Sequence, residues 1–390
     1  MSTAGDFKGS IQPGVGQLPR SAWERLFPDE AEGWAYYKAC ETAPPQGFTF
    51  AAVAVHRGEE LVAAAPVFEM SYRLDTPLQA SWKAASDWLA RHAPGLVSLR
   101  VVGLGSPLAD RLHLGLVPGL GDDERAAVLA VLLATLDAHA ASRGAKILAI
   151  KDLADTDKPK AHDALLAAGF TCVSSLPVAC LALPFETEDE YLASLSASTR
   201  KDIRRKLKTA GGVRLQYRTG IAGLEDQIFA LYEETRANSG LDYGDFEQMS
   251  PAWFGEVARG LGDKALCLLC WVGDDLVGFN LLFVEPGRVI DKFIGFKYPQ
   301  ARELNLYLVT WMANVRWCLQ HGITRLQSGQ TAYTMKVRLG SGLDKSWVYF
   351  RHRGRFWNLI VKAVGPSMAF DKHDPELQKL AAKAVGRRAQ

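Results

Sequence analysis

The sequence has few cysteines, no long apolar run and almost no net charge, and each shortage excludes a class of protein. Six cysteines scattered over 390 residues are too few for a disulfide scaffold and fit a reducing compartment. No apolar stretch reaches the roughly 20 residues that cross a bilayer, and the first residues lack the basic and apolar regions of a signal peptide. A net charge of +2 creates no overall attraction to nucleic acid or to a membrane. We therefore expect a cytoplasmic globular protein of two domains.

Common catalytic and metal-binding motifs are also missing. Cys267 and Cys270 form a C-x-x-C pair, but they lie in a predicted apolar strand, where residues three apart face opposite sides of the sheet, so we expect no metal site. There is no phosphate-binding loop of the G-x-x-x-x-G-K-[ST] type and no G-x-S-x-G elbow of a serine hydrolase. The string GLGS is followed by Pro107 instead of a third glycine, which argues against a dinucleotide-binding fingerprint.

What the sequence does contain is the same order of predicted elements twice. Each half begins with a hairpin, at 48–70 and 265–283, in which two apolar runs flank a polar glycine turn. In the first half there follow strands at 97–104 and 111–117, a helix over 122–142, a strand at 146–153, a helix ending at 170 and a single strand over 172–183. In the second half there follow a strand at 289–296, a helix over 303–320, a strand at 323–329, a segment ending at 340 and a strand at 346–353. This repetition predicts a duplicated domain.

Between the halves, residues 186–220 predict a basic helix. Its apolar residues recur at helical spacing, and six of the eleven residues from Ser198 to Lys208 are Lys or Arg on another face. The basic face is either an ordinary solvated surface or a ridge that binds the phosphates of a cofactor or nucleic acid. The candidate members of this ridge are Arg200, Lys201, Arg204 and Arg205.

Two strings resemble one protein family. EYLASLSASTRKDIRRKLK at 190–208 resembles the basic helix of the FemAB-like, CelD-like (BioF2-like acetyltransferase) branch of the GNAT acyltransferase superfamily, which is related to the peptidoglycan-bridge aminoacyltransferases. The segment 302–340 resembles the distal part of that branch, a helix, a glycine, a strand and then a lysine shortly before Leu-Gly. With ELVAAAPVF and the duplicated element order, the likeness spans about residues 22–353.

The resemblance implies an α/β fold of two tandem GNAT-like domains, each a mixed, largely antiparallel sheet flanked by helices. Residues 1–185 are then a degenerate first domain with an acceptor or structural role, and residues 221–370 are the catalytic domain. Residues 186–220 are the linking basic helix, and residues 371–390 are a C-terminal basic helix or tail.

One departure from the family concerns the acyl donor. The usual GNAT pyrophosphate loop is missing from both strand–helix junctions, at 118–123 and 298–305, although free amides at a helix N-terminus still bind phosphate. The resemblance implies direct transfer of an acyl group from acyl-CoA or acyl-carrier protein to a small-molecule or peptide amine, with no tightly bound cofactor and no metal. Two alternatives stay open: an aminoacyl-tRNA-dependent ligase that acts on a cell-wall precursor, and a non-catalytic module that binds a glycan, a peptide or a carrier protein.

Polar residues gather around the junction of the second half, where the predicted elements are otherwise apolar. Acyl transfer to an amine needs a base, a stabilised oxyanion and a proton for the leaving group. We expect Asp291 or Glu303 to be the base and Tyr333 to donate a proton or orient the acceptor, while Lys336, which matches the family's lysine, binds a phosphate or carboxylate. The remaining candidates for substrate binding are Asp242, Tyr243, Lys292, Asn305, Tyr307, Gln327 and Gln330. Each has an ordinary alternative, as a helix-capping, surface or core side chain.

The C-terminal stretch interleaves arginines with aromatic residues over 349–357. This pattern suits a membrane interface or RNA contacts, and a closing strand followed by a packed helix explains it equally well. Residues 1–185 hold 16 basic and 20 acidic side chains, a net charge of −4, whereas residues 186–390 hold 29 and 23, a net charge of +6. The basic half therefore also contains the predicted site.

Overall fold

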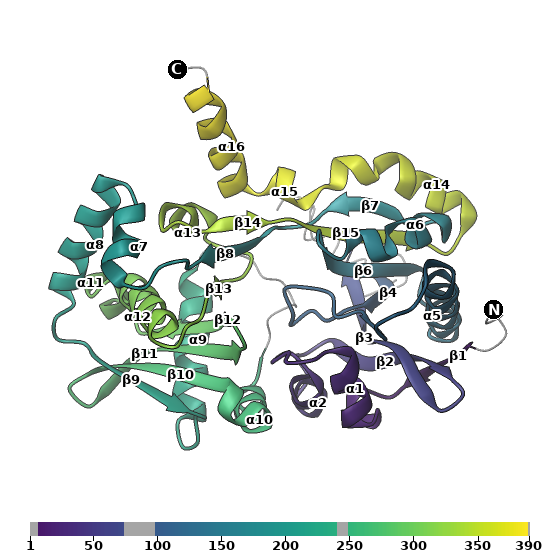
Figure 1. The fold of residues 1–390 in the computed structure, drawn as a ribbon, viewed down its shortest axis with the longest axis horizontal. Coiled ribbons are helices and arrows are strands. Elements are labelled where there is room, and N and C mark those ends of the chain that lie inside the picture. Colours follow the sequence, from purple (N-terminus) through teal and green to yellow (C-terminus); the bar gives the residue numbers. More distant parts are fainter. Residues whose placement is uncertain (1–6, 74–97, 240–248, 389–390) are drawn as a thin grey trace.

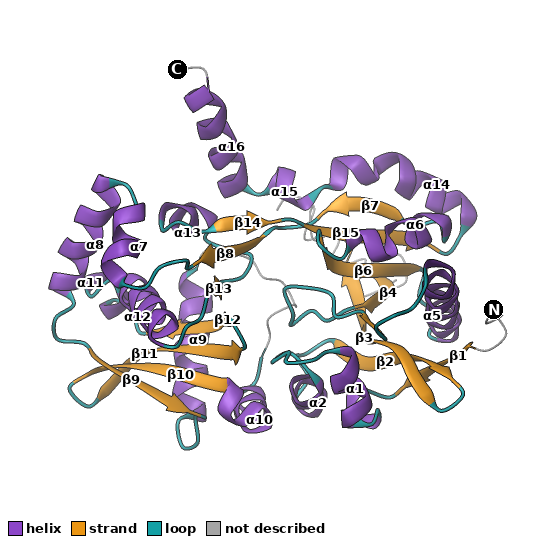
Figure 2. Cartoon of the chain, viewed as in Figure 1, coloured by secondary structure: helices purple, strands orange, loops and turns teal. Residues whose placement is uncertain are grey.

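The computed structural model describes residues 7–73, 98–239 and 249–388. They form two β-sheets, each covered by helices, which lie side by side along the longest axis of the molecule (Figure 1; Figure 2). The predicted α/β architecture with two sheets is confirmed. The described helices span Arg20–Leu26 (α1), Trp34–Thr42 (α2), Asp122–Ser142 (α5), Lys158–Ala167 (α6), Glu188–Ser194 (α7), Ala197–Thr209 (α8), Glu225–Asn238 (α9), Pro251–Leu261 (α10), Gln300–Glu303 (α11), Leu306–Gln320 (α12), Tyr333–Arg338 (α13), Arg355–Val364 (α14), Phe370–His373 (α15) and Pro375–Arg388 (α16).

The first sheet has the strand order β1-β2-β3-β4-β6-β15-β7, with β5 paired to β3. Its strands span Phe7–Gln12 (β1), Phe48–Arg57 (β2), Glu60–Arg73 (β3), Ser98–Leu104 (β4), Gly115–Leu116 (β5), Ile147–Ala154 (β6), Thr171–Ser174 (β7) and Ser346–His352 (β15). The predicted hairpin is confirmed as β2 and β3, and its two-residue turn uses Gly58 in the left-handed region, with φ of 59°. The strand predicted over 111–117 shrinks to the two residues of β5.

The helix predicted over 122–142 is α5. Among the described residues it is the one helix long and apolar enough to span a bilayer. Its stripe of leucines, including Leu132 and Leu136, is buried against the strands of the first sheet. The apolar composition of α5 is therefore accounted for by packing in the core of the first domain.

The second sheet has the strand order β14-β8-β13-β12-β11-β10-β9. Its strands span Val178–Ala182 (β8), Arg214–Thr219 (β9), Ala265–Val272 (β10), Asp275–Glu285 (β11), Arg288–Phe296 (β12), Arg325–Gln327 (β13) and Gly342–Asp344 (β14). The second predicted hairpin is confirmed as β10 and β11. In both halves a strand, a long helix and a parallel strand follow the hairpin, as β4-α5-β6 and as β12-α12-β13. The duplication predicted from element order is thus present in the fold.

The two sheets exchange strands, which the sequence did not predict. The single strand expected over 172–183 is divided at Pro177, because proline has no amide hydrogen for a sheet ladder. The part before it, β7, pairs with β15 in the first sheet, while the part after it, β8, pairs with β13 and β14 in the second. Although β15 comes from the second half, it pairs with β6 and β7 of the first. Each sheet therefore contains a strand that chain order assigns to the other half.

The helix expected between the halves is also divided, into α7 and α8. Leu195 takes an extended conformation, and the hydroxyl of Ser196 accepts a hydrogen bond from the amide of Thr199. A serine at this position satisfies an otherwise free amide of the first turn, so the sequence itself carries the signal for a new helix start. The buried Ile203 of α8 packs with the residues that cover the second sheet.

An apolar core joins the two domains. One cluster of buried residues combines α1, α2 and β2 of the first half with α9, α10, β10 and β11 of the second. Where α10 approaches α2, a Cβ at Gly260 would lie 3.2 Å from the carbonyl oxygen of Ala35, so glycine permits this close approach. Trp253 and Tyr36 are fully buried in the same contact, with ring centroids 6.4 Å apart. The relative placement of the domains is therefore fixed by core packing.

Candidate active site

The site begins where two parallel strands separate. β12 and β13 pair over three residues only, Arg288–Ile290 against Arg325–Gln327. Beyond this point the strands diverge, and the next residues along them are Asp291 and Ser328. The carboxyl ends of parallel strands are where α/β sheets bind ligands, because backbone groups and side chains there are not used by the sheet. The candidate site is built from the side chains at this divergence.

A β-bulge in β12 places two consecutive polar residues inside the protein. Leu282 pairs with Asp291 and Leu281 pairs with Phe293, so Lys292 is an extra residue without a partner across the ladder. Bulges of this kind re-aim side chains and occur often next to active sites. Asp291 and Lys292 therefore both point into the structure, although simple alternation along a strand predicts that one of them faces solvent.

Asp291 is a carboxylic acid with few compensating partners. Asn280 Nδ2 of β11 donates a hydrogen bond to Asp291 Oδ1, at 2.5 Å. Burial raises the pKa of Asp291 to about 6, although the hydrogen bond from Asn280 and the charge of Lys336 lower it. Near neutral pH the carboxylate form therefore predominates but accepts a proton readily, which is the property of a general base.

A chain of buried amides fixes the position of Asp291. Asn314 Nδ2 of α12 donates to the side-chain oxygen of Asn280, and Tyr217 Oη of β9 donates to Asn314 Oδ1 at 3.3 Å. Asn280 and Asn314 are 0% and 1% exposed. Because buried amides are costly unless they are hydrogen-bonded, this chain defines one orientation for each of its members and for the carboxyl group at its end.

Lys336 supplies a buried positive charge opposite Asp291. It lies in α13, its residue is 4% exposed, and its Nζ donates to the carbonyl oxygen of Ser328. Burial lowers the pKa of Lys336 to about 8, against the neighbouring charges of Asp291 and Asp110, which raise it. The ammonium form therefore persists at neutral pH without a carboxylate in direct hydrogen-bonding contact among the described residues. A buried ammonium held in this way is available to stabilise negative charge on a substrate.

The first domain contributes Asp110 to the same cluster. Gln327 Nε2, at the end of β13, donates to Asp110 Oδ2 at 3.2 Å. Burial raises the pKa of Asp110, but the charges of Lys292 and Lys151 outweigh burial, so the pKa lies below its usual value. Asp110 is therefore ionised at neutral pH. The site thus combines a carboxylate of the first domain with Asp291 and Lys336 of the second.

Next to this cluster, ion pairs connect the two domains. Lys292 Nζ contacts Glu32 Oε1 at 2.5 Å, with side chains 4% and 2% exposed. Arg288 contacts Glu30 of the first domain at 3.0 Å and Glu285 of its own domain at 2.5 Å. Lys292 is therefore already neutralised by Glu32, so its predicted part in substrate binding is replaced here by a contact between domains.

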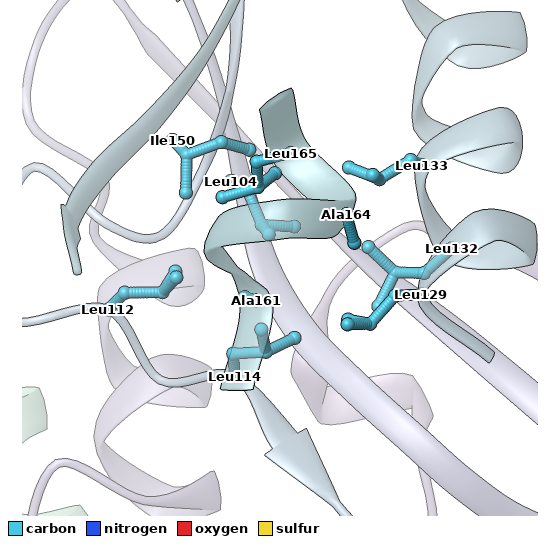
Figure 3. A pocket seen from close by; sticks show the side chains of 10 residues that line it. All are labelled: Leu104, Leu112, Leu114, Leu129, Leu132, Leu133, Ile150, Ala161, Ala164 and Leu165. Atoms are coloured by element: carbon cyan, nitrogen blue, oxygen red, sulfur yellow. The ribbon is translucent and has the colours of Figure 1, made fainter. Parts of the chain in front are cut away.

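In the first domain, apolar side chains fill the space between the corresponding strands and the helices that cover them. There β4 and β6 pair in parallel over Val101–Leu104 and Ile147–Ile150, as β12 and β13 do in the second. Figure 3 shows Leu104, Leu112 and Ile150 pointing toward leucines of α5 and α6, and the cavity between them is only about 10 Å³. All ten residues that line this cavity are leucine, isoleucine or alanine, so it offers no polar side chain to a substrate. Directly beyond the parallel pairing, Lys151 and Asp152 of β6 form an ion pair, so charged side chains occur where the parallel strands end in both domains.

Two predicted residues lie beside the cluster but hold the strand crossover. Tyr333 Oη donates to the carbonyl oxygen of Pro177 at 2.8 Å, and Gln330 Nε2 donates to that of Leu176 at 2.9 Å. Burial raises the pKa of Tyr333 well above its usual value. The hydroxyl of Tyr333 is therefore already used to fix the segment between β7 and β8, in place of the proton-donor role expected from the sequence.

The residues at the start of the long helix have different environments. Glu303 is exposed on α11, outside the buried cluster, so the structure separates it from Asp291 as a candidate base. Asn305 precedes α12 in the left-handed region, with φ of 52°. The hydroxyl of Tyr307 is buried and has no hydrogen-bond partner among the residues the structure describes. Burial, followed by the charge of Asp291, raises the pKa of Tyr307, so this hydroxyl stays protonated as a donor.

Only some side chains of the predicted basic ridge of α8 are free to bind a ligand, because the others contact the protein itself. Arg200 donates to the carbonyl oxygens of Ala193 and Leu195, and so fixes the turn between α7 and α8. Arg205 pairs with Asp202 at 2.7 Å. Lys201 and Arg204 are exposed and make no ion pair within the described ranges. Asp242 and Tyr243, the remaining candidates, lie outside the described residues.

Sequence reasoning missed Asp110, Asn280, Asn314 and Tyr217. Asn280 and Asn314 carry a recognisable signal, since each is an amide with apolar residues on both sides in the sequence, where a polar group needs a partner. Asp110 carries no such signal, because it lies in an irregular segment of the other half. Within the described ranges, no group of three or more His, Cys, Asp or Glu side chains is arranged to hold a metal ion.

The chain is similar to known proteins in part of its sequence and in its fold. Residues 197–337 match the family described as acetyltransferase (GNAT) domain, and this range contains Asp291 and Lys336. No curated protein matches the chain. Among solved structures, FemX superposes with a TM-score of 0.53 at 11% identity, covering 83% of this chain and 97% of FemX. A tandem GNAT protein from the clavulanic acid biosynthesis pathway superposes with a TM-score of 0.50 at 13% identity, covering 89% and 99% of the two chains.

These likenesses confirm the fold expected from the sequence. Residues 197–337 are similar in sequence to an acetyltransferase (GNAT) domain, and most of the chain has the fold of FemX and of a protein described as tandem GNAT. At identities this low, the two structures show the fold alone. The donor and acceptor must therefore be argued from the residues of the site.

Proposed function

We propose that this chain transfers an acyl group from a thioester to an amine that binds where β12 and β13 diverge. The observation that carries the proposal is that Asp291 and Lys336 lie near enough for each charge to affect the pKa of the other, while burial raises the pKa of the carboxyl group to about 6 and lowers that of the ammonium group to about 8. Groups perturbed in this way by burial are enriched at catalytic sites. They occur in the half of the chain that matches a GNAT domain.

The reaction assigns one role to each group. The carboxylate of Asp291 takes a proton from the ammonium form of the acceptor, and the free amine attacks the thioester carbonyl carbon. Lys336 faces the negative charge that develops on the carbonyl oxygen. When the tetrahedral intermediate collapses, the carbon–sulfur bond breaks and the second nitrogen proton passes to the thiolate, leaving an amide and a thiol.

Tyr307 is the proposed hydrogen-bond donor to the leaving sulfur. A buried hydroxyl without a partner costs about 1–3 kcal/mol, and Tyr307 has none within the described residues. A substrate atom that accepts its hydrogen bond removes this cost, which favours binding in one orientation. This assignment replaces Tyr333, whose hydroxyl is held by Pro177.

The exposed cations of α8 favour a donor with an anionic carrier. Lys201 and Arg204 lie on a helix that packs against α12, the helix that follows the diverging strand. The phosphates of acyl-CoA and the acidic surface of an acyl-carrier protein fit such a face. The same observation supports a second candidate, an aminoacyl-tRNA-dependent ligase, because phosphates of tRNA are recognised by the same chemistry.

Measuring the thiol or the deacylated tRNA that is released distinguishes the candidate donors and the candidate functions. Purified protein is incubated with acetyl-CoA, long-chain acyl-CoA, acyl-carrier protein or charged tRNA and a panel of amines, and free thiol or deacylated tRNA is followed. We expect one donor to be consumed, Asp291→Asn to lower the rate about 10²–10⁴-fold, and Lys201→Ala with Arg204→Ala to raise KM for that donor. Lys8→Ala, an exposed lysine of β1, is the matched control. Binding of a glycan or peptide without turnover of any donor would instead show a non-catalytic module.

A further inference from the structure

The helix α14 turns its apolar side to solvent. Among the described residues, eight large apolar side chains are exposed, and six of them lie between 356 and 370. Phe356 and Leu359 are the most exposed, at 68% and 66%, and Trp357 is 57% exposed. Ordinary surfaces of soluble proteins show single exposed apolar residues, whereas a concentration of this kind marks an interaction surface.

The exposed orientation is fixed by polar contacts on the opposite side of the helix. Asn358 Oδ1 accepts a hydrogen bond from the amide of His352 at 2.9 Å, and Asn358 Nδ2 donates to the carbonyl oxygen of Gly169 at 3.0 Å. The helix is therefore attached to the first domain through its amide side chain. Because Asn358 faces the protein, rotation that would bury Phe356 and Leu359 would break both hydrogen bonds and leave polar groups buried.

The same surface extends to neighbouring residues and carries positive charge. Leu166 of α6, 44% exposed, lies close to Gly169, which contacts α14. The helix contains Arg355 and Lys362 and no acidic residue, and both basic side chains are exposed. Figure 1 shows α14 along one outer side of the molecule, with α15 and the base of α16 on that same side. Aromatic and aliphatic side chains flanked by Arg and Lys on an outer helix are typical of a helix that lies in the plane of a membrane surface.

We propose that α14 binds the surface of an anionic phospholipid bilayer, with Phe356, Trp357 and Leu359 inserted among the lipids and Arg355 and Lys362 at the headgroups. Charge complementarity selects this occupant, because the helix is wholly cationic and its aromatic residues suit the boundary between acyl chains and headgroups. The binding is reversible and peripheral, since a helix of ten residues inserts one face only. The proposal concerns a surface away from Asp291 and does not depend on the proposed reaction.

Vesicle flotation of the full chain tests the proposal. Vesicles of phosphatidylcholine with 30 mol% phosphatidylglycerol are compared with vesicles of phosphatidylcholine alone, at low and high salt. We expect the wild-type chain to float with the anionic vesicles and to be released by salt. Phe356→Ser with Leu359→Ser should weaken partitioning at least about tenfold, and Arg355→Gln or Lys362→Gln should each weaken it about fivefold.

The controls separate lipid binding from loss of fold and from other partners. Val272→Ser, an exposed apolar residue of β10 at 39% exposure, should leave flotation unchanged, and all variants should keep the wild-type unfolding midpoint. Wild-type protein that does not float with anionic vesicles overturns the proposal. So does flotation that survives Phe356→Ser with Leu359→Ser. A concentration-dependent dimer, or binding to an RNA oligonucleotide, that those substitutions abolish while flotation persists would assign the surface to that other partner.

Discussion

Asp291→Asn tests the site through stability as well as through activity. The pKa of this carboxyl group rises from an ordinary value of 3.8 to about 6 in the folded chain. At 1.36 kcal/mol for each pKa unit, ionised Asp291 costs the native state about 3 kcal/mol at neutral pH. The amide of asparagine has nearly the same shape, keeps an oxygen for the hydrogen bond from Asn280 and carries no charge. The substitution should therefore raise the free energy of unfolding while it removes the base.

The size of this effect depends on pH in a defined way. Below the unfolded value of 3.8, Asp291 is protonated in both states and costs nothing. The cost grows as the pH rises toward the folded pKa of about 6 and is constant above it. The substitution also removes a negative charge near Lys336, and this loss offsets part of the gain in the free energy of unfolding. We expect Asp291→Asn to be more stable than wild type by about 2 kcal/mol at pH 7.5 and by almost nothing at pH 4.

Urea denaturation at both pH values, followed by tryptophan fluorescence, measures this difference. Asp275→Asn is the matched control, because Asp275 is 50% exposed and pairs with Lys297 at 2.7 Å on the surface, so its effect should stay below about 1 kcal/mol. The same samples are assayed for acyl transfer. A variant that is less stable at pH 7.5, or a gain that does not change with pH, would refute the assignment of a raised pKa to Asp291. Full activity would refute its role as base.

Three further predictions follow from the same contacts. The value of kcat/KM should rise through pH of about 6, as Asp291 ionises, and fall above about 8, as Lys336 loses its proton; initial rates across pH 5–10 check this, and a profile flat through pH 6 would contradict it. Arg288→Met removes the cation that pairs with buried Glu285, while Glu30 keeps its pair with Arg111, so urea denaturation should show a loss of about 3 kcal/mol. In contrast, Arg325→Met, at an exposed pair, should cost under about 1 kcal/mol. Leu132→Ala in the first domain should cost about 2–5 kcal/mol in unfolding and leave kcat unchanged; a specific loss of kcat would place chemistry in the first domain.

Local patterns in the sequence predicted the helices and strands better than they predicted which strands pair with each other. Both hairpins follow from apolar runs around a glycine turn, and α5 and α12 follow from helical spacing. The run at 172–183 is apolar on both sides of Pro177, and nothing in it shows that β7 and β8 join different sheets. Strand partners are chosen by contacts distant in sequence, here with β15 and with β13. For the same reason the division of the chain at residue 185 does not describe the sheets.

The site was predictable to the extent that its residues interrupt an apolar pattern. Asp291 and Lys336 stand out in this way, and both lie in the buried cluster. Glu303 stands out equally in the sequence but is exposed, because a carboxylate in the first turn of a helix is also favoured on a surface. Asp110 reaches the cluster only because the interface of the domains places it against Gln327. No spacing within either half encodes that contact.

The strand exchange gives a reason why two related domains share one site. The segment that carries the chain from β7 to β8 is held by Tyr333 and Gln330 of the second half. Tyr333 lies in the helix that carries Lys336, and Gln330 lies in the loop before it. Because β8 completes the second sheet, the first half is needed to shape the strand edge beside the site. Exchange of strands between the duplicated halves therefore makes the second sheet, and the site at its edge, dependent on the first half.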